Sequence, residues 1–224
     1  MKKLLVLFFS IFSSSIFAQT KVDSLRYKRA QKAPTTLDVK YLARFLKAGA
    51  LSDEKTIETF YYWIHQNIEY DAELMNNPNK TWDDVSVVKT LENKKTICAG
   101  YASLMVEMCQ AVKIECVVVE GAAQIDDDKY DSPHAWNAVK INGIWKLLDV
   151  TWGSGSLFGE TYEKQLDLNY LYCKPEDFIL EHFPDDEKWQ LLTQPVSKLE
   201  FSGEEYIEKR KAFFESRSVS ITID

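Results

Sequence analysis

The chain has 224 residues, of which 46% are hydrophobic and 27% charged, and its net charge at pH 7 is −7. The negative charge argues against a nucleic-acid partner and against adhesion to anionic lipid. The sequence also contains no glycine-rich phosphate loop, and its length fits one domain with a well-packed core.

The N-terminal stretch MKKLLVLFFSIFSSSIFAQT has the pattern of a secretory signal peptide. Two lysines give a basic start, and the apolar run that follows is too short to span a membrane. We predict cleavage near Ala18, so that residues 1–18 are the signal peptide and the product is exported, either periplasmic or secreted. No stable membrane insertion is expected after cleavage. An uncleaved N-terminal anchor is the alternative.

The rest of the chain divides into three predicted parts. Residues 19–51 form an N-terminal arm, which is a loose segment over residues 20–36 and a short helix over residues 38–47. Residues 52–195 form the main domain, and residues 196–224 form a C-terminal extension.

The main domain begins with a predicted helix that Ser52 caps. Its apolar residues recur at helical spacing and form one stripe, namely Ile57, Phe60, Tyr61, Ile64 and Ile68. Residues 72–81 contain several asparagines and a proline and predict a loop, and residues 83–91 predict another short helix.

A second apolar stripe predicts a helix within residues 94–112, KKTICAGYASLMVEMCQAV. Thr96 is the expected N-cap, which places Cys98 in the first turn, where unpaired N–H groups and the helix dipole favour an anion. A helix N-terminus or a nearby protonated histidine lowers the pKa of a thiol from its usual value of about 8.5. Cys98 is therefore a candidate nucleophile, and the alternative is a buried cysteine that only fills space.

Residues 132–152, SPHAWNAVKINGIWKLLDVTW, predict a β-hairpin that follows a strand at residues 115–121. Asn-Gly favours a type I′ turn, and a two-residue loop pairs Ile141 with Ile144. In that register His134 and Asp149 are diagonal neighbours on one face, within reach of each other. They can supply the base of a catalytic triad and the group that orients it. A polar, solvated hairpin end is the alternative.

The C-terminal third carries weaker signals. The GSGS run begins a predicted flexible stretch over residues 153–168, and Pro175 begins a predicted helix that ends before Pro184. A charged helix is expected at residues 204–215, followed by the β-like SVSITI.

Two of these segments, ICAGYASLM and SPHAWNAVKINGIWKLLDVTWGSG, resemble the transglutaminase-like superfamily of Cys-His-Asp proteins. Two others, YYWIHQNIEYD and NYLYCKPEDFILEHFPDDEKWQLL, resemble the branch that includes the kyphoscoliosis peptidase and bacterial relatives. The resemblance covers about residues 52–195. It implies an α+β fold with a papain-like or transglutaminase-like core, in which the nucleophile helix packs on an antiparallel sheet. It also assigns the triad to Cys98, His134 and Asp149.

The resemblance further suggests an oxyanion donor beside the backbone N–H of Cys98. Some transglutaminases use a tryptophan upstream of the cysteine, just before a short helix, and Trp82 stands in a comparable place. Its indole N–H is a donor only, which suits that role. Tyr70 is the competing residue, and simple packing is the alternative for both.

The remaining candidate ligands point to structural roles. His65 is predicted to pack or to face solvent, and His182 to be a structural cap near a helix end. The sequence has no HExxH or CxxC motif, and the aspartates at residues 126–128 lack the glycine of a calcium loop. No metal and no cofactor is predicted. Cys109 and Cys116 are expected to be packing residues, with a disulfide between them as the alternative.

We therefore expect an exported enzyme in which Cys98 attacks an amide or peptide carbonyl and forms a thioester. Water or an amine then releases the acyl group, so that a peptidase or amidase and a transglutaminase remain open. The expected partner is a protein or peptide substrate, including cell-envelope material. A catalytically silent transglutaminase-like binding or scaffolding protein is the alternative.

Overall fold

The structure, a computed structural model, describes residues 22–124, 132–159 and 161–218. The predicted signal peptide, the aspartates at residues 126–128 and nearly all of the β-like C-terminal segment lie outside these residues. Within the described part of the chain, no helix is both long and apolar enough to cross a membrane.

Five antiparallel strands form the central sheet, in the order β8, β5, β4, β3 and β9. Their bounds are Cys116–Ala123 for β3, Ser132–Ile141 for β4, Ile144–Leu148 for β5, Leu171–Cys173 for β8 and His182–Pro184 for β9. The predicted α+β class with an antiparallel sheet is confirmed.

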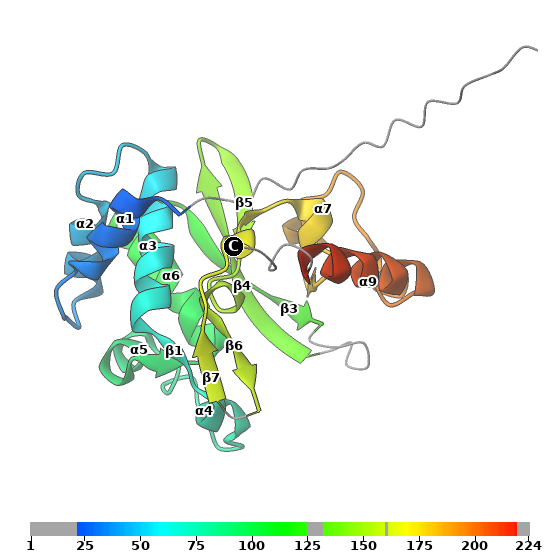
Figure 1. Cartoon of the computed structure of the whole chain (residues 1–224), viewed down its shortest axis with the longest axis horizontal. Helices are drawn as coiled ribbons and strands as arrows, with labels where there is room; N and C mark the ends of the chain where they lie inside the picture. Colours follow the sequence, from blue (N-terminus) through cyan, green and yellow to red (C-terminus); the bar gives the residue numbers. More distant parts are fainter. Residues whose placement is uncertain (1–21, 125–131, 160, 219–224) are drawn as a thin grey trace, which may run out of the picture.

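Helix α6 (Cys98–Ala111) packs against β3 and β4, as expected for a nucleophile helix on a sheet. Helices α2 (Val39–Lys47) and α3 (Asp53–Asn67) pack against α6, and α1 (Ser24–Gln31) packs against α3. Figure 1 shows α1, α2 and α3 together on one flank of the sheet, with α7 and α9 on the other flank. The predicted apolar stripe, which runs along α3 to its C-cap Ile68, is fully buried in the main core because α3 packs against α1, α2 and α6.

The predicted hairpin register is confirmed. Ile141 pairs with Ile144 and Asn137 pairs with Leu148. Both turn residues have positive φ, 52° at Asn142 and 82° at Gly143, which is the requirement of a type I′ turn. The turn therefore fixes which side chains at the far end of the hairpin share a face.

Three segments that the sequence predicted to be irregular are regular. The arm at residues 20–36 contains α1, because Asp23 caps it and Ala30 is buried. The loop at residues 72–81 contains α4 (Ala72–Asn76), which Asp71 caps. The glycine-rich stretch after the hairpin forms strands β6 (Gly155–Phe158) and β7 (Thr161–Lys164), which pair with each other.

The short helix predicted at residues 83–91 begins later, as α5 (Val87–Asn93) with Ser86 as its N-cap. The helix that Pro175 begins is one turn long, α7 (Pro175–Phe178), and the chain then enters β9. Helices α8 (Lys198–Phe201) and α9 (Glu204–Ser218) end the described chain, and α9 confirms the predicted charged helix. The short 3-10 helices are η1 (Trp152–Ser154), η2 (Leu168–Tyr170) and η3 (Glu187–Gln190).

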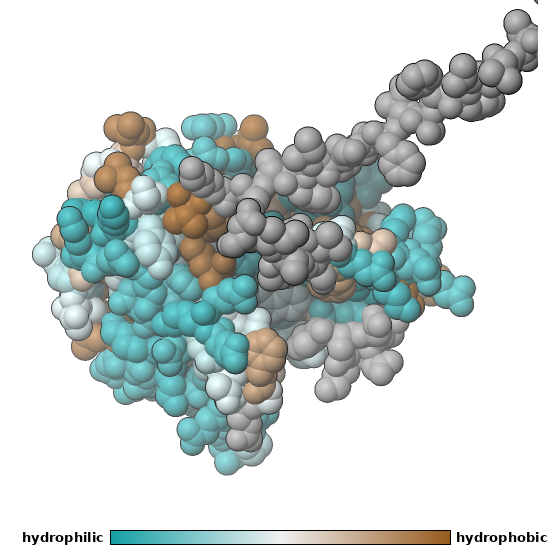
Figure 2. Space-filling view, in the orientation of Figure 1, coloured by the Kyte–Doolittle hydropathy of each residue, from teal (hydrophilic) through white to brown (hydrophobic). Residues whose placement is uncertain are grey.

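The face shown in Figure 2 is mainly hydrophilic, with isolated hydrophobic groups, one of them over the β6–β7 hairpin. Phe158 of β6 is 63% exposed. Scattered exposed apolar side chains of this kind are ordinary on a protein surface.

Candidate active site

Cys98 is the first residue of α6, and the chain before it is held by a small parallel sheet. Strand β1 (Glu69–Tyr70) pairs with β2 (Lys95–Thr96), and the N–H of Asp71 donates to the carbonyl of Thr96 at 2.9 Å. Thr96 is therefore a strand residue, and its predicted role as N-cap is wrong. Ile97 occupies the cap position without a side-chain hydrogen bond, which leaves the first N–H groups of α6 without a side-chain cap.

The thiol of Cys98 lies beside the imidazole of His134, close enough for each group to shift the pKa of the other. Burial acts to raise the pKa of this thiol, but the side chain of His134 and the backbone N–H of Ala135 outweigh it, so the pKa is lowered. The environment therefore favours a thiolate, which is the reactive form of a cysteine.

His134 lies near the start of β4, and Asp149 directly follows β5. Nε2 of His134 is 2.6 Å from Oδ2 of Asp149, so the imidazole donates to the carboxylate. Burial acts to lower the pKa of His134, but the charge and hydrogen bond of Asp149 and the contact with Cys98 raise it to about 10. A protonated imidazole beside a thiolate is the ion pair of papain-type nucleophiles.

Asp149 is completely buried and accepts hydrogen bonds on both oxygens. Its Oδ1 accepts from the backbone N–H groups of Thr151 at 2.8 Å and Trp152 at 3.2 Å. Burial acts to raise its pKa, but the two histidines beside it, His134 and His182, hold the pKa well below its usual range. Asp149 is therefore a carboxylate at neutral pH, and it cannot serve as a proton donor there.

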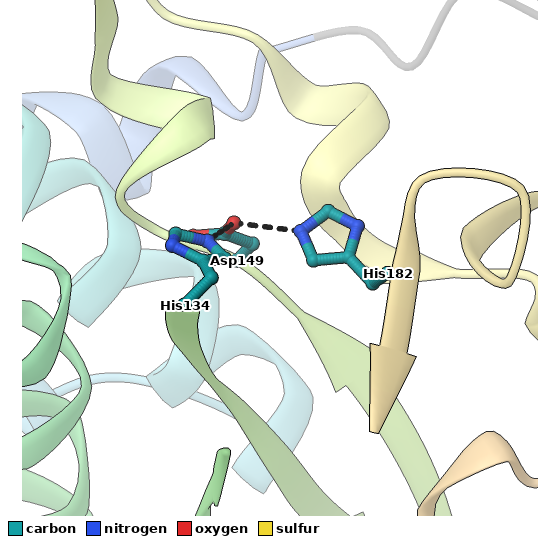
Figure 3. Close-up of side chains that lie close together, drawn as sticks. All are labelled: His134, Asp149 and His182. Atoms are coloured by element: carbon teal, nitrogen blue, oxygen red, sulfur yellow. Dashed lines mark hydrogen bonds and ion pairs between the residues drawn. The ribbon is translucent and has the colours of Figure 1, made fainter. Parts of the chain in front are cut away.

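His182 is the site residue that the sequence did not reveal. Its Nε2 lies 3.0 Å from Oδ2 of Asp149, and Figure 3 shows the rings of His134 and His182 converging on this carboxylate. The predicted role of His182 as a helix cap is wrong, because it begins strand β9. No local pattern marks it, since it reaches Asp149 only through the pairing of β9 with β3.

A cavity of about 440 Å³ opens beside Cys98 and His134. Aromatic and aliphatic side chains make up much of its lining, and the acidic residues Asp167 and Glu181 also contribute to it. The larger aromatic and aliphatic residues are Tyr70, Met75, Trp152, Leu157, Tyr162, Tyr170 and Phe214. A pocket of this size and character can hold a peptide side chain or a similar organic group next to the thiol.

The two candidate oxyanion donors occupy different places. Trp82 is 79% exposed and is not among the described residues that line the cavity. Tyr70 does line it, and the pairing of β1 with β2 holds Tyr70 next to Thr96, two residues before Cys98. Burial, together with the nearby Cys98 and Asp149, raises the pKa of Tyr70, so its phenol keeps the hydrogen that a donor needs.

Among the described residues, one group of potential metal ligands lies close together. The ligand atoms of His134, Asp149 and His182 all lie within 4.8 Å of one another, a set that suits a transition metal. Hydrogen bonds from both imidazoles to Oδ2 already account for this arrangement. The predicted independence from metals and cofactors stays a prediction.

Two of the other cysteines, together with His65, are buried side chains. All four cysteines are free thiols, and Cys109 and Cys116 are buried; burial and the neighbouring Cys116 raise the pKa of Cys109. His65 is buried with Nδ1 3.2 Å from the carbonyl of Ser154, and burial lowers its pKa. Cys109 and Cys116 are packing residues as predicted, and of the two roles predicted for His65 the structure supports packing.

Comparison with known proteins points to one family. The family model described as Transglutaminase-like superfamily matches residues 40–150. Kyphoscoliosis peptidase of Mus musculus is 35% identical over 168 residues, which cover 70% of this chain and 25% of the mouse protein. Kyphoscoliosis peptidase of Homo sapiens is 31% identical over 207 residues, which cover 88% of this chain and 28% of the human protein.

One solved structure, described as a crystal structure of a TGase, aligns with a TM-score of 0.42 and 18% identity. The alignment covers 68% of this chain and 38% of the solved chain. Of the two kyphoscoliosis peptidases, the chain spans about a quarter of the length.

Proposed function

We propose that this chain, which carries a domain of the transglutaminase-like superfamily, is a thiol enzyme that acts on amide or peptide carbonyls through a thioester. One observation carries the proposal. Cys98 lies beside His134 at the edge of a cavity, and His134 is hydrogen-bonded to Asp149 at 2.6 Å. This is the arrangement of nucleophile, base and orienting group that acyl transfer requires.

In the first step, the thiolate of Cys98 attacks the carbonyl carbon and forms a C–S bond. The tetrahedral intermediate then collapses, the C–N bond breaks, and His134 gives its proton to the departing nitrogen. The product is a thioester on Cys98 and a free amine or ammonia. Asp149 keeps the imidazole in the orientation that these proton transfers need.

In the second step, water or an amine attacks the thioester. His134 accepts a proton from this nucleophile, the C–S bond breaks, and Cys98 leaves as a thiolate. Hydrolysis and amine transfer share this route and differ only in which nucleophile reaches the acyl group, so the chemistry of the site serves both.

The negative charge on the carbonyl oxygen needs hydrogen-bond donors in both steps. The backbone N–H of Cys98 is at the first position of α6, where the helix itself supplies no acceptor. We assign the second donor to the hydroxyl of Tyr70, because Tyr70 lines the cavity with Cys98 whereas Trp82 is exposed.

The proposed substrate is a protein or peptide, and the proposed place of action is outside the cytoplasm. The cavity is wide enough for a side chain and open to the surface near Cys98, which suits a polymer substrate. The basic and apolar N-terminal pattern supports export, and cell-envelope material is then within reach of the enzyme.

A substrate screen with matched variants tests the proposal. Peptide and amide substrates are incubated with the wild-type protein, with and without a primary amine, and intact-mass analysis looks for an acyl group on the protein. We expect an adduct on wild type that is absent from Cys98→Ala and present in the control Cys173→Ala, since Cys173 is a partly exposed thiol on β8. If iodoacetamide labels Cys98 but no substrate places an acyl group on the protein, the silent binding protein is favoured instead.

A further inference from the structure

We propose that His182 is a positioning residue for Asp149, so that the site is a four-residue array of Cys98, His134, Asp149 and His182. This inference rests on the proposed function, because it assigns His182 a role in the same acyl transfer. His182 is not among the described residues that line the cavity, so it acts on the reaction through Asp149 and not by touching the substrate.

The hydrogen-bond geometry gives His182 a defined direction of donation. Its Nε2 lies 3.0 Å from Oδ2 of Asp149, the same oxygen that is 2.6 Å from Nε2 of His134. An ionised carboxylate only accepts hydrogen bonds. His182 must therefore carry a hydrogen on Nε2 and donate it to Asp149.

This bond completes the surroundings of a fully buried charge. Backbone N–H groups of Thr151 and Trp152 satisfy Oδ1, and the two imidazoles satisfy Oδ2 (Figure 3). With His182 in place, hydrogen bonds hold both oxygens of the carboxylate and so fix the orientation of its plane. Without it, Oδ2 would be held by His134 alone, and the carboxylate and the catalytic ring could turn together.

The surroundings of His182 hold its ring in one orientation. The ring stacks on Phe178 with centroids 3.9 Å apart and an interplanar angle of 8°. The indole of Trp152 lies 4.4 Å away on centroids, and the backbone of His182 pairs with Ala123 on β3. Because the ring is completely buried in these contacts, it is a rigid donor and suits the task of fixing Asp149.

Two substitutions separate the hydrogen bond from the packing. His182→Phe keeps a ring that can stack on Phe178 but removes the N–H donor. His182→Gln loses the ring but keeps an amide N–H that can reach Oδ2 of Asp149. Folding of both is checked by far-UV circular dichroism and by thermal melting, and all rates are expressed per folded molecule.

The readout is the rate at which iodoacetamide alkylates Cys98 as a function of pH. We expect His182→Phe to slow alkylation at neutral pH by about tenfold and to move the acid limb of the profile to higher pH, because a loosely held imidazolium stabilises the thiolate less. His182→Gln should recover most of the rate and the position of the limb. Wild-type behaviour of His182→Phe, or equal losses in both variants, overturns the inference.

The same experiment distinguishes this inference from the proposed function. His134→Ala is run alongside, and it should abolish the enhanced reactivity of Cys98. If Cys98 of wild type reacts like an ordinary thiol, the proposed function fails and the role of His182 fails with it. If wild type is enhanced and depends on His134 but His182→Phe matches it, only the role of His182 fails.

A second measurement on the wild-type protein covers the case in which His182→Phe does not fold. The chain has three histidines, so ¹⁵N-histidine labelling gives a simple spectrum. We expect Nε2 of His182 to carry a proton that exchanges slowly with water. A bare Nε2 on His182, with the proton on Nδ1 alone, contradicts the inference.

Discussion

Nε2 of His134 and Oδ2 of Asp149 lie 2.6 Å apart although the two residues are fifteen positions apart along the chain. The contact is a consequence of the hairpin turn, in which Asn142 and Gly143 both adopt positive φ and set the register of β4 against β5. Because side chains on paired strands alternate in face, this register places both groups on one side of the sheet.

Replacing Asp149 by asparagine should remove the charge and leave the fold in place. An amide cannot accept from His134 and His182 as a carboxylate does, and it favours the wrong imidazole tautomer. We expect turnover to fall by up to about 10⁴-fold, the size of the effect in a serine-protease triad, with an unchanged far-UV spectrum. A loss of less than tenfold in the folded variant would remove Asp149 from the site.

The assignment of the oxyanion donor predicts a contrast between two aromatic residues. Tyr70→Phe removes a single hydroxyl at the cavity wall and should lower kcat by about 10²-fold, with a smaller change in KM, since the donor acts on the developing charge. Trp82→Phe at an exposed position should change kcat less than twofold. The opposite pattern would return the role to Trp82.

A stability prediction concerns the contact between α3 and the segment that follows Asp149. The hydroxyl of Tyr61, which is fully buried, donates to the carbonyl of Asp167 at 2.7 Å. Tyr61→Phe should lower the free energy of unfolding by about 1 kcal/mol because the hydrogen bond to this carbonyl is lost. Tyr41 is 52% exposed, and the matched control Tyr41→Phe should stay within about 0.5 kcal/mol of wild type in urea titrations.

The proposed export predicts a specific N-terminus. When the whole gene is expressed in a host that secretes proteins, N-terminal sequencing of the product should begin just after Ala18. Replacing Leu5 by Arg should block this cleavage, because a charge interrupts the apolar run. A cytoplasmic wild-type product that keeps Met1 would show that the N-terminal pattern is not a signal peptide.

The parts of the site that sequence reasoning found are those with local causes. The turn at Asn142 and Gly143 and the position of Cys98 at a helix start follow from short patterns, and both agree with the structure. His182 and the placement of Tyr70 depend on strand pairings between distant segments, β9 with β3 and β1 with β2. No periodicity within one segment reports such pairings.

The errors in the fold have a related origin. The GSGS run predicted flexibility from composition, but β6 and β7 pair with each other, and Gly155 adopts a φ of 153°, which few other residues tolerate. Thr96 has the chemistry of an N-cap, but its backbone pairs with Tyr70 in a strand. Tertiary contacts therefore override local preference at the start of the nucleophile helix.

The central claim is that Cys98 is activated by His134, and the pH dependence of its alkylation tests this most directly. The structure lowers the pKa of Cys98 and raises that of His134 to about 10, so the thiolate should persist below the usual thiol pKa of about 8.5. With limiting iodoacetamide at pH 6.5, peptide mapping should find Cys98 labelled well ahead of Cys109, Cys116 and Cys173, and His134→Ala should abolish that lead. Labelling of Cys98 no faster than of Cys173, with the acid limb of an ordinary thiol, would contradict the account.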